Sequence, residues 1–514
     1  MPTEFEGEIE RYVKSCFAEY EPSAPPDRRK AIHDALWGTT TLSPAEIALL
    51  DCPLLQRLRF IHQTAFAFYV YPSANHSRLE HSIGVLFLVT RLIETLNSKK
   101  GSDFITPLEK QQLRLAALLH DCGHGIMSHI SERFYEHHPW IVDMQVDPKY
   151  QAAKAHELIS YMIVKSRMFD EFFSKIRAKY GKEDKEIANI DFGKLDEIAN
   201  LIIGRPPSPE KAYLAGIING PFDADKLDYI SRDSYFTGLR LAVDIERLLY
   251  ALDVSPVETE TGTEKRLVAI SSAASVFEQI LFSKIQLYPC LYQHAKVKAT
   301  DSMLTMFLKL IRDQYGHFKT KSEEGKILPQ VMLSSPVDFL QLTDFDLLNP
   351  YLYGGVPELQ KTILNLRNRD LWLKALVISS NTVDKNMDNI TRLIKSEHVQ
   401  SILDGLGVEI YSRIPDHLKT TVYDVVVDFP DVAPLNEANL QVVKQPDDKV
   451  VSLNSLFPTH DWLQTYVAKK WKGHVFCPKE LQLVVNKAAI EVLETRLQVK
   501  FNSLATSLAH IRSS

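Results

Sequence analysis

A strongly apolar run at residues 113–119, Leu-Arg-Leu-Ala-Ala-Leu-Leu, ends directly in His120 and Asp121. Leucine, alanine and arginine are good helix formers, so the run predicts a helix. Because apolar side chains occur on nearly all of its sides, this helix should be buried among other helices. A carboxylate at the end of a buried helix needs a strong partner, since an unpaired charge is costly to remove from water. We therefore expect a largely helical fold with a cation site at the end of this helix.

Helical patterning extends over most of the chain. Apolar residues recur at i, i+1, i+4 and i+7 between residues 54 and 61, which is the buried stripe of an amphipathic helix. Similar patterns cover 79–96, 273–315 and 357–379. A chain of 514 residues allows two to four domains of about 100–200 residues. We expect a mainly α protein with a peripheral N-terminal segment (1–45), a helical core (46–315) and a smaller α+β C-terminal lobe (316–514).

Strands are expected mainly after residue 408. Segments after this position that are rich in valine, isoleucine and tyrosine predict short strands. The aromatic run at 66–71 predicts a small hairpin or an extended loop. The expected later strands lie at 408–412, 421–428, 439–444 and 450–453, the last two joined by a turn at 447–449.

Composition excludes several classes of protein. Lysine plus arginine number 59 and aspartate plus glutamate 65, and a net charge of −6 does not suit a protein built around bulk affinity for phosphate backbones. The five cysteines are widely spaced and odd in number, which suits a reducing compartment rather than a disulfide framework. The acidic start lacks an apolar segment, and no apolar run approaches the roughly 20 residues that span a bilayer. We expect a cytoplasmic protein without a membrane partner.

Histidine is concentrated in one part of the chain, and this supports a metal site. Nine of the 17 histidines lie between residues 62 and 156. Imidazole and carboxylate groups together suit Mn, Fe, Zn, Co or Mg. The glycines in Cys122-Gly123-His124-Gly125 give the backbone freedom to turn His120 and Asp121 toward one ion. The alternative is that Asp121 caps the next helix and that His120 is a hydrogen-bonded core histidine.

A longer set of motifs narrows the class. His81, His120-Asp121 and Asp225 occur in the order H…HD…D, which resembles the HD-domain metal-dependent phosphohydrolases. The accompanying motifs are Asp51-x-Pro-x-x-Gln56-Arg57-Leu58-Arg59, Gln63, Arg78-Leu-Glu-His81-Ser, His120-Asp-x-Gly-His124-Gly-x-x-Ser-His129, His156-Glu157, Asp223-x-Asp225-Lys226-x-Asp228-Tyr229-x-x-Arg232-Asp233 and Tyr292-Gln293-His294. In this order they resemble the HD-domain dNTP triphosphohydrolases, which include the vertebrate SAM-and-HD-domain dNTPase and bacterial dGTPase-like enzymes. The resemblance covers about 45–315, implies an HD-domain helical core, and leads us to expect no SAM domain.

The resemblance implies a reaction and roles for particular residues. Members of this family cleave a dNTP at its α-phosphate and release deoxynucleoside and triphosphate. The implied ligands of a divalent metal (Mn, Mg, Fe or Zn) are His81, His120, Asp121 and Asp225. His129 is the implied general acid, with Glu132 orienting it and with His124 and His156 completing the inner shell. The implied substrate contacts are Gln63, Arg78, Lys226, Tyr229, Asp233, Lys284, Tyr288 and Tyr292.

Some of these positions are implied to select the sugar of the substrate, and two carry a residue type that differs from the usual one in the family. Gln63 and Asp233 match positions that bind the 3′-hydroxyl, while Tyr292 matches a ring that leaves no space for a 2′-hydroxyl. Lys284 stands where the family usually has arginine, which replaces a bidentate fork by a point charge. Glu132 stands where aspartate is more common, so the same charge has a longer reach.

The resemblance also implies nucleotide regulation in a homo-oligomer. Asp51, Gln56 and Arg59 match a first allosteric site that reads a guanine base. The second site departs from the family, because its basic stretch is replaced by 270–276 and Ala295 stands where lysine usually follows Gln-His. The matching residues that this second site retains are His294, Arg369 and Lys374. We expect an activating nucleotide and a tetramer, with a dimer or a hexamer as alternatives.

Two other functions stay open at this point. The same metal site would serve a nuclease or phosphodiesterase acting on single-stranded nucleic acid or a signalling nucleotide. Gln63, Asp233 and Tyr292 favour a pocket for a mononucleotide and so disfavour this alternative. A non-catalytic nucleotide sensor would keep the fold without turnover. Single residues also have plainer readings: Arg78 and Glu80 as a surface ion pair, Arg57 and Arg59 as solvated positions, and Tyr292 as core. The sequence does not distinguish a role in dNTP homeostasis from one in defence against phage.

Overall fold

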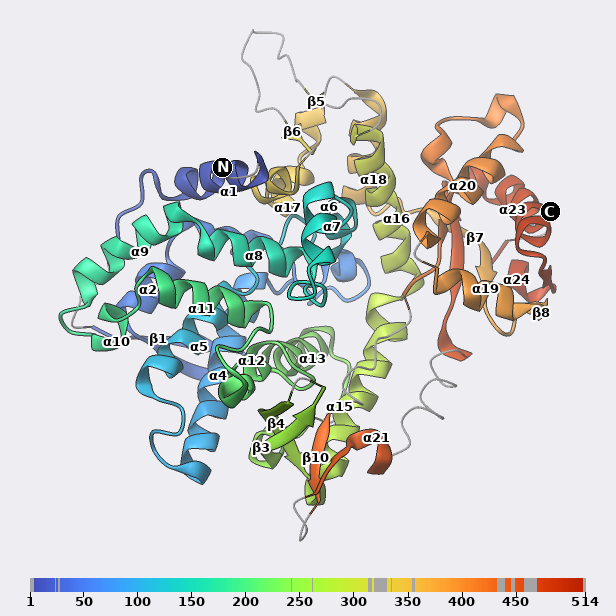
Figure 1. The fold of residues 1–514 in the computed structure, drawn as a ribbon. Helices are drawn as coiled ribbons and strands as arrows, with labels where there is room; N and C mark the ends of the chain where they lie inside the picture. The colour runs from blue at the N-terminus through green and yellow to red at the C-terminus, as the bar shows by residue number, and fades with distance from the viewer. Residues whose placement is uncertain are drawn as a thin grey trace. The chain divides into compact units, whose positions relative to one another are not determined.

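The chain forms two compact units in a computed structural model that describes residues 4–511 except 24, 26–27, 242, 261, 313–316, 319–330, 334, 354–355, 397, 432–439, 445–448 and 457–468 (Figure 1). The first unit comprises Met1–Lys284, Ser335–Leu347 and Leu435–Pro458, and the second comprises Ile285–Ser334, Leu348–Pro434 and Thr459–Ser514. The expected boundaries at 45/46 and 315/316 stay predictions.

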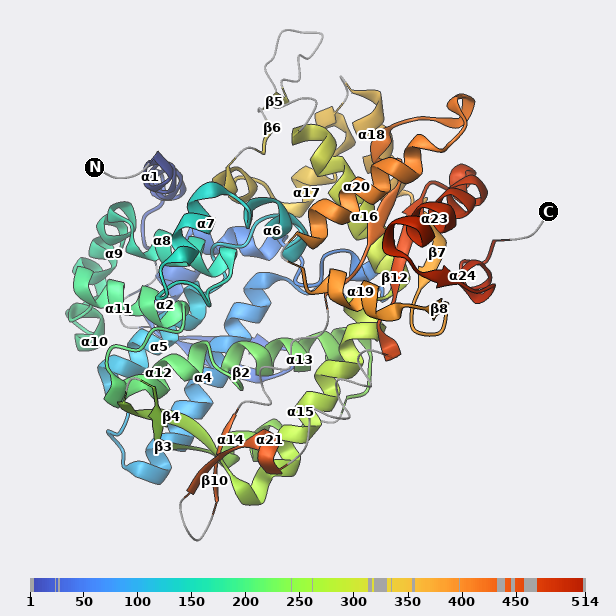
Figure 2. The same ribbon diagram turned by 45° about the vertical axis from the view of Figure 1, so that its right-hand side comes forward.

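Three long helices form the centre of the first unit. Helix α4 (Arg78–Lys100) packs against both α5 (Pro107–Leu119) and α13 (Ala224–Thr237) (Figures 1 and 2). Capping boxes start α4 at Ser77 with Glu80 and α5 at Thr106 with Glu109, so each helix begins at a defined residue. Helix α5 is buried over residues 111–119. The predicted buried helix before His120 is confirmed.

Further helices surround this centre. Helix α1 (Glu4–Phe17) packs against α9 (Arg167–Tyr180) and α8 (Ala155–Lys165), and the rings of Phe17 and Phe172 stack with centroids 3.8 Å apart. The other helical elements of this unit are α2 (Pro44–Leu50), α3 (Pro53–Gln56), η1 (Arg57–Phe60), η2 (Ala65–Tyr69), α6 (His129–Tyr135), α7 (Pro139–Val146), α10 (Lys185–Ala188), α11 (Phe192–Ile202), η3 (Pro209–Lys211), α12 (Ala212–Ile218), α14 (Ile245–Ala251), η4 (Ser271–Ala273), α15 (Ala274–Leu287, up to Lys284), η7 (Pro336–Leu340), α17 (Asp344–Leu347) and α21 (Leu453–Leu456).

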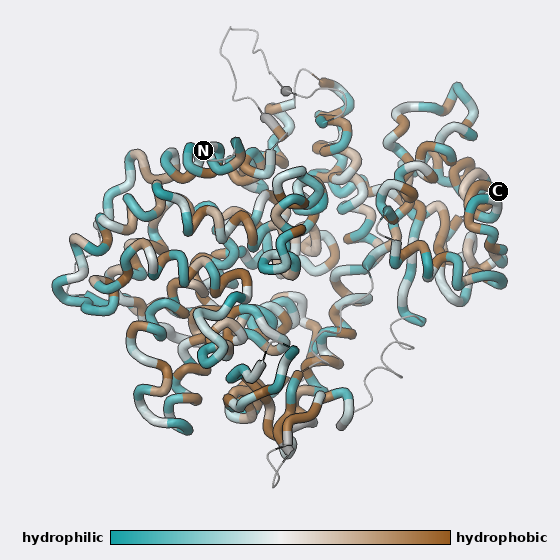
Figure 3. Tube along the Cα trace, viewed as in Figure 1, coloured by the Kyte–Doolittle hydropathy of each residue, from teal (hydrophilic) through white to brown (hydrophobic). Residues whose placement is uncertain are grey.

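Two small sheets complete the first unit. Strands β1 (Lys30–Asp34) and β2 (Gly38–Leu42) form a hairpin. The larger sheet has the order β11-β10-β4-β3, in which β3 (Leu252–Thr259) and β4 (Gly262–Ile270) are antiparallel and β10 (Gln441–Lys444) is parallel to β4. Apolar residues gather where these strands meet (Figure 3), with Val257, Val268 and Val443 buried together. Strand β11 (Lys449–Ser452) pairs with β10, which confirms the expected strand pair; its turn lies largely outside the described residues.

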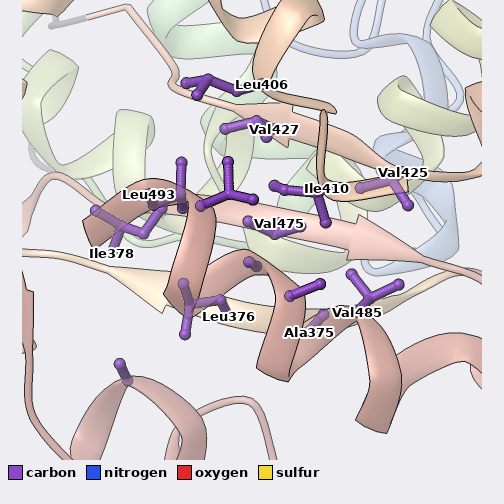
Figure 4. Close-up of a cluster of buried hydrophobic side chains, with 14 of the residues drawn as sticks. Ala375, Leu376, Ile378, Leu406, Ile410, Val425, Val427, Val475, Val485 and Leu493 are labelled. Carbon is purple, nitrogen blue, oxygen red and sulfur yellow. The ribbon is translucent and has the colours of Figure 1, made fainter. Parts of the chain in front are cut away.

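The second unit is built around a three-stranded antiparallel sheet of order β7-β12-β9. The strands are β7 (Leu373–Ile378), β12 (Gly473–Cys477) and β9 (Val426–Asp428), and helices α20 (Val399–Ser412) and α23 (Gln482–Leu497) pack against them. Their buried side chains, including Leu376, Val475 and Leu493, form one core (Figure 4). The remaining elements are η5 (Tyr288–Tyr292), α16 (Ala295–Leu310), β5 (His317–Phe318), β6 (Val331–Met332), η8 (Pro350–Tyr353), α18 (Pro357–Arg367), β8 (Val383–Lys385), α19 (Met387–Ile394), η9 (Asp416–Leu418), η10 (Val422–Asp424), η12 (Lys479–Leu481), β13 (Lys500–Phe501) and α24 (Leu504–Ser507).

The mainly α architecture with a smaller α+β C-terminal part is confirmed, but several local predictions are wrong. Residues 357–379 were expected to be helical throughout, but helix α18 ends at Arg367 and residues 373–378 form strand β7. Residues 408–412 belong to helix α20 rather than to a strand, because the buried residues Leu403, Leu406 and Ile410 form one helical face. Residues 65–69 form the 3-10 helix η2 rather than an extended segment. The predicted strand at 421–428 is shorter, since a 3-10 turn precedes β9. Among the described residues, no helix is long and apolar enough to cross a bilayer.

Candidate metal centre and histidine cluster

Four predicted ligands come together at the ends of three helices. His81 lies in the first turn of α4, Asp225 in the first turn of α13, and His120 and Asp121 follow α5 directly. His81 Nε2 lies 3.3 Å from His120 Nε2, 2.9 Å from Asp225 Oδ1 and 3.8 Å from Asp121 Oδ2. His120 Nε2 lies 3.4 Å from Asp121 Oδ1 and 4.0 Å from Asp225 Oδ1. Helix ends thus bring residues 144 positions apart in the chain, from 81 to 225, to one point.

These separations fit a single bound cation. Two donors that each lie about 2.1 Å from one ion are about 3.0 Å apart at a right angle and about 4.2 Å apart when opposite. The observed separations of 2.9–4.0 Å fall within or just below that range. His81, His120 and Asp121 are also buried, so bulk water does not screen their charges.

Hydrogen bonds to the outer ring nitrogens turn the inner nitrogens toward the centre. His81 Nδ1 lies 2.7 Å from Asp228 Oδ2 and His120 Nδ1 lies 2.8 Å from the Ala117 carbonyl oxygen. Both oxygens can only accept, so each Nδ1 carries the proton and each Nε2 presents a lone pair when the ring is neutral. Lone pairs and carboxylate oxygens that face one another repel unless a cation lies between them. The donor set therefore fits a divalent metal.

The pKa shifts of His81 and Asp225 also indicate that positive charge is favoured between these two side chains. Burial lowers the pKa of His81, but its hydrogen bonds to Asp225 and Asp228 outweigh burial and raise the pKa to about 10. Burial raises the pKa of Asp225, yet the hydrogen bond and the charge of His81 hold it well below its usual range. In the absence of a metal a proton therefore occupies the position between His81 and Asp225, and a divalent ion that binds there would displace it.

A buried ion-pair network supports His81 from behind. Asp228 accepts from Arg232 Nε at 2.8 Å, and Arg232 Nη2 donates to Asp34 Oδ2 at 2.9 Å. Asp228 and Arg232 are both fully buried on α13, and they lie against Gly84 of α4. Asp228 and Arg232 belong to a sequence motif but had no predicted role, and neither Asp34 nor Gly84 was predicted to support the site. Their spacing on α13, i and i+4, was the available signal for an ion pair.

Arg78 links the metal centre to the following loop. Its Nη1 donates to Asp121 Oδ2 at 2.8 Å and its Nε donates to Ser128 Oγ at 2.9 Å. Its Nη2 is buried and has no hydrogen-bond partner among the described residues. Arg78 is buried, while Glu80 accepts from the Ser77 backbone, so the reading of these two residues as a surface ion pair is wrong.

Beside the metal centre lies a second cluster, formed by His124, His129, Glu132 and His156. Glu132 bridges two rings, with Oε2 2.8 Å from His129 Nδ1 and Oε1 2.7 Å from His156 Nδ1. Burial raises the pKa of Glu132, but the charge of His156 and the two hydrogen bonds hold it well below its usual range. Burial likewise lowers the pKa of His156, and Glu132 reverses the shift. Glu132 is therefore an ionised carboxylate that orients both rings.

His124 connects the two clusters. Its ring stacks on His156 with centroids 3.7 Å apart, and its Nε2 lies 3.5 Å from Asp121 Oδ1. Neither ring nitrogen has a hydrogen-bond partner among the described residues, although the side chain is buried. Burial, together with the positive charge of Arg78, lowers the pKa of His124 well below its ordinary value. A buried neutral ring without partners is suited to hold a ligand or a water molecule at this site.

The structure does not support the alternative in which Asp121 caps the next helix. The next helix, α6, begins at His129, so Asp121 caps no helix. Gly123 packs tightly under this turn, since a Cβ there would lie 2.3 Å from the His156 carbonyl oxygen. The close approach of the turn to α8 therefore requires glycine.

The predicted substrate residues fall into both units. Gln63 is buried, its backbone N–H donates to the His76 carbonyl oxygen at 3.0 Å, and His76 Nε2 lies 2.7 Å from Asp233 Oδ1. His76, which had no predicted role, thus connects Gln63 with Asp233. Lys226 donates to the Gly220 carbonyl oxygen and to Asp223, the N-cap of α13. Tyr229 lies on α13, Lys284 is buried on α15, and Tyr288 and Tyr292 belong to the second unit.

The predicted regulatory residues form one group in each unit. In the first unit, Gln56 Nε2 donates to the Leu50 carbonyl oxygen, Arg59 donates to Gln56, and Asp51 is exposed at the end of α2. Arg57 donates to the carbonyl oxygens of Cys122 and His124, so it is not a solvated position. In the second unit, His294, Arg369 and Lys374 lie in a basic cluster that also contains Lys296 and Lys472.

Two family models match parts of the chain, and several known proteins are similar to it. Residues 78–230 match the model of the HD domain and residues 330–503 match that of the HD associated region. A SAMHD1 homologue of Dictyostelium discoideum, named as a deoxynucleoside triphosphate triphosphohydrolase, is 26% identical over 369 residues, 70% of this chain and 63% of that protein. Human SAMHD1, with the same named activity, is 27% identical over 350 residues, 65% of this chain and 52% of that protein. An uncharacterised protein of Methanocaldococcus jannaschii is 24% identical over 460 residues, 88% of this chain and 80% of that protein.

The matched region thus covers less than two thirds of these two SAMHD1 relatives. All four candidate ligands, His81, His120, Asp121 and Asp225, lie inside the HD-domain match. The chain belongs to the HD-domain family of hydrolases and is a relative of the SAMHD1 proteins within it.

Proposed function

We propose that the chain is a metal-dependent deoxynucleoside triphosphate triphosphohydrolase, which converts a dNTP and water to deoxynucleoside and triphosphate. The observation that carries the proposal is the adjacency of two groups: a four-residue cation site, and a histidine–glutamate cluster whose His124 lies 3.5 Å from the ligand Asp121. Phosphate ester cleavage needs both a Lewis acid and a proton donor in one place. The named activity of the SAMHD1 relatives supports the same reaction.

His81, His120, Asp121 and Asp225 would hold the metal. A bound divalent ion would polarise the α-phosphate and lower the pKa of a coordinated water. Mn, Mg, Fe and Zn all suit this nitrogen and oxygen donor set. The chain's own residues bind, orient and protonate the substrate.

Arg78 would bind the phosphate, because its buried Nη2 has a donor without a partner among the described residues and its other nitrogens fix the guanidinium plane. His129 would protonate the departing 5′-oxygen from Nε2, since Nδ1 is paired with Glu132. Ionised Glu132 would stabilise the imidazolium form of His129 before the proton is transferred. Gln63, Asp233, Lys226, Tyr229, Lys284, Tyr288 and Tyr292 are proposed as contacts to the sugar, base and phosphates, with Tyr292 excluding a 2′-hydroxyl.

Product identification tests the proposal. The metal-loaded protein would be incubated with each dNTP alone and in pairs, because an enzyme that needs a nucleotide activator can be inactive on one substrate. Phosphorus NMR is expected to show triphosphate, and chromatography is expected to show deoxynucleoside. Nucleoside monophosphates released from single-stranded DNA would instead support the nuclease reading, and no turnover with any mixture or metal would support a non-catalytic sensor.

His129→Gln should reduce kcat by at least about 10²-fold, because a positioned general acid contributes roughly 10²–10⁴-fold. Glutamine keeps a similar size but cannot deliver a proton. Steady-state kinetics would measure kcat, and a metal titration should show unchanged stoichiometry. His137→Gln, at an exposed histidine eight residues further on, is the matched control and should retain wild-type kinetics. Equal activity of the wild type and His129→Gln would remove His129 from the mechanism.

We also propose that an activating nucleotide regulates a cytoplasmic homo-oligomer, with a tetramer favoured. The basic cluster of the second unit supports this proposal. Burial lowers the pKa of Lys374, and the charges of Lys472 and Lys296 lower it further; burial and Arg369 do the same to Lys296. Crowded positive charges of this kind are stabilised by a polyphosphate. In the first unit, Asp51, Gln56 and Arg59 are proposed to bind the base of an activating nucleotide.

Lys374→Glu should raise the nucleotide concentration that gives half-maximal activation by at least about tenfold, equivalent to about 1.4 kcal/mol. The kcat at saturating activator should change little, because Lys374 lies outside the catalytic set. Activity would be measured against activator concentration at fixed dNTP. Lys385→Glu reverses the same charge at an exposed position of the second unit and should leave the activation curve unchanged. An unchanged curve for Lys374→Glu would contradict the regulatory role.

A further inference from the structure

A buried carboxylate far along the chain holds the turn that precedes His129. Asp344, at the start of α17, is 1% exposed. Its Oδ1 accepts from the Met127 backbone N–H at 2.6 Å. Its Oδ2 accepts from the His62 backbone N–H at 2.7 Å and lies 2.8 Å from His62 Nδ1. One carboxylate therefore joins two segments of the first unit that are 65 residues apart, at 62 and 127.

The turn that Asp344 holds has an unfavourable backbone. Met127 has φ 51° and Ser128 has φ 53°, although neither is glycine. Residues with a Cβ rarely adopt this region, so two in succession persist only when neighbouring contacts enforce them. Ser128 is also tied by its side chain, which donates to the His62 carbonyl oxygen at 2.6 Å and accepts from Arg78. Asp344 and Ser128 thus bind the same His62 segment from two sides.

The position of His129 depends on this turn. His129 is the first residue of α6, directly after Ser128, and its side chain is 59% exposed. The ring lies edge-on to His124 and His156, with centroids 5.1 and 5.7 Å away, and it is hydrogen-bonded to Glu132. These contacts can form only while the backbone before α6 holds His129 in place. The same turn reaches the metal ligand Asp121 through Ser128 and Arg78. A change in the turn would move His129 relative to the metal centre.

We propose that Asp344 is a positioning residue for the general acid, and this inference rests on the proposed function. Asp344 touches neither His129 nor a metal ligand in the contacts above; it acts by enforcing the Met127–Ser128 backbone. A displacement of about 1 Å of a catalytic group can lower the rate on the order of 10²-fold. Loss of Asp344 should therefore lower kcat while leaving the cation site and substrate affinity nearly intact.

Asp344→Asn is the test, with two independent readouts. Asparagine keeps the volume and one acceptor oxygen, but its amide nitrogen cannot accept from the His62 N–H groups. Hydrogen exchange followed by mass spectrometry should show at least about tenfold faster exchange in peptides covering 126–132. Steady-state kinetics should show kcat lowered on the order of 10²-fold, with KM and metal stoichiometry within about twofold of wild type. His62→Ala removes one of the three N–H groups and should shift both readouts less, in the same direction.

Asp346→Asn is the matched control. Asp346 lies two residues on, is exposed and accepts from Thr343 within its own turn. It should leave exchange at 126–132 and kcat unchanged. Wild-type exchange and kcat in folded Asp344→Asn would overturn the inference, as would a change confined to KM or to metal content. A wild type that hydrolyses no dNTP would instead refute the proposed function, and the exchange result would still show whether Asp344 holds the turn.

Discussion

Asp121→Asn is expected to abolish metal binding at the candidate centre and to lower dNTP hydrolysis by about 10³-fold. Asp121 lies 3.4 Å from His120 Nε2, 3.5 Å from His124 Nε2 and 2.8 Å from Arg78 Nη1, so it contacts both clusters and the proposed phosphate-binding arginine. Asparagine retains the shape but lacks the negative charge that a divalent ion needs. Loss of about 4 kcal/mol of Lewis-acid stabilisation corresponds to about 10³-fold in rate.

Thermal unfolding with and without Mn²⁺ would separate metal loss from instability. A ligand that binds only the folded state raises Tm, so the wild type should melt higher when Mn²⁺ is added. The variant should melt at the same temperature with and without Mn²⁺. It should also be less stable than wild type in either buffer, because Arg78 is left buried without its carboxylate partner.

Asp143→Asn is the matched control, since Asp143 is an exposed carboxylate on α7. This variant should retain both the Mn²⁺-dependent rise in Tm and the wild-type rate. An Asp121→Asn protein that still gained stability from Mn²⁺ and still turned over dNTP at the wild-type rate would exclude the centre described here.

Two of the four candidate ligands, His120 and Asp121, were predictable because their chemistry is local in the sequence. The apolar run before His120 predicts a buried helix end, and a carboxylate at that end demands a cation. His81 and Asp225 followed only from the resemblance to the HD family. Nothing in their spacing shows that the first turns of α4 and α13 meet; that meeting depends on how the two helices pack.

The residues that support the site were not predictable, because their contacts also depend on how distant segments pack together. Asp344 and Asp34 act across long stretches of chain, the first 217 positions from Met127 and the second 198 positions from Arg232. Neither belongs to a motif. The positive φ angles of Met127 and Ser128 also contradict local preference, since neither residue is glycine. Local preference fails where tertiary contacts enforce a functional turn.

The wrong strand at 408–412 has a similar cause. Val408, Ile410 and Tyr411 favour strands by composition. The helix α20 nevertheless begins nine residues earlier, at Val399, and its apolar face at Leu403, Leu406 and Ile410 packs against the sheet of the second unit. A window confined to five residues could not detect a period of 3.6 residues per turn.

Gly84 illustrates how tightly the helices behind the metal centre are packed. A Cβ at this position of α4 would lie 2.0 Å from Asp228 Oδ1 and 2.3 Å from Arg232 Nη2. No Cβ tolerates such distances, and both neighbours are fully buried on α13. The Asp228 carboxylate in turn holds His81 Nδ1. Glycine at 84 is therefore what allows α13 to bring the Asp228–Arg232 pair against His81.

Gly84→Ala is expected to destabilise the protein by roughly 3–5 kcal/mol and to eliminate the rise in Tm with Mn²⁺. The methyl group must push Asp228 away from Arg232 or from His81, and disruption of a buried ion pair costs about that much. Because His81 would lose the hydrogen bond that sets its tautomer, metal affinity should fall even in the fraction that folds. Gly405→Ala makes the same change inside α20, where an added Cβ meets nothing within 4 Å, and it should raise stability by up to about 1 kcal/mol through helix propensity. Equal stability and equal Mn²⁺ response in the two variants would mean that the Asp228–Arg232 pair does not position His81.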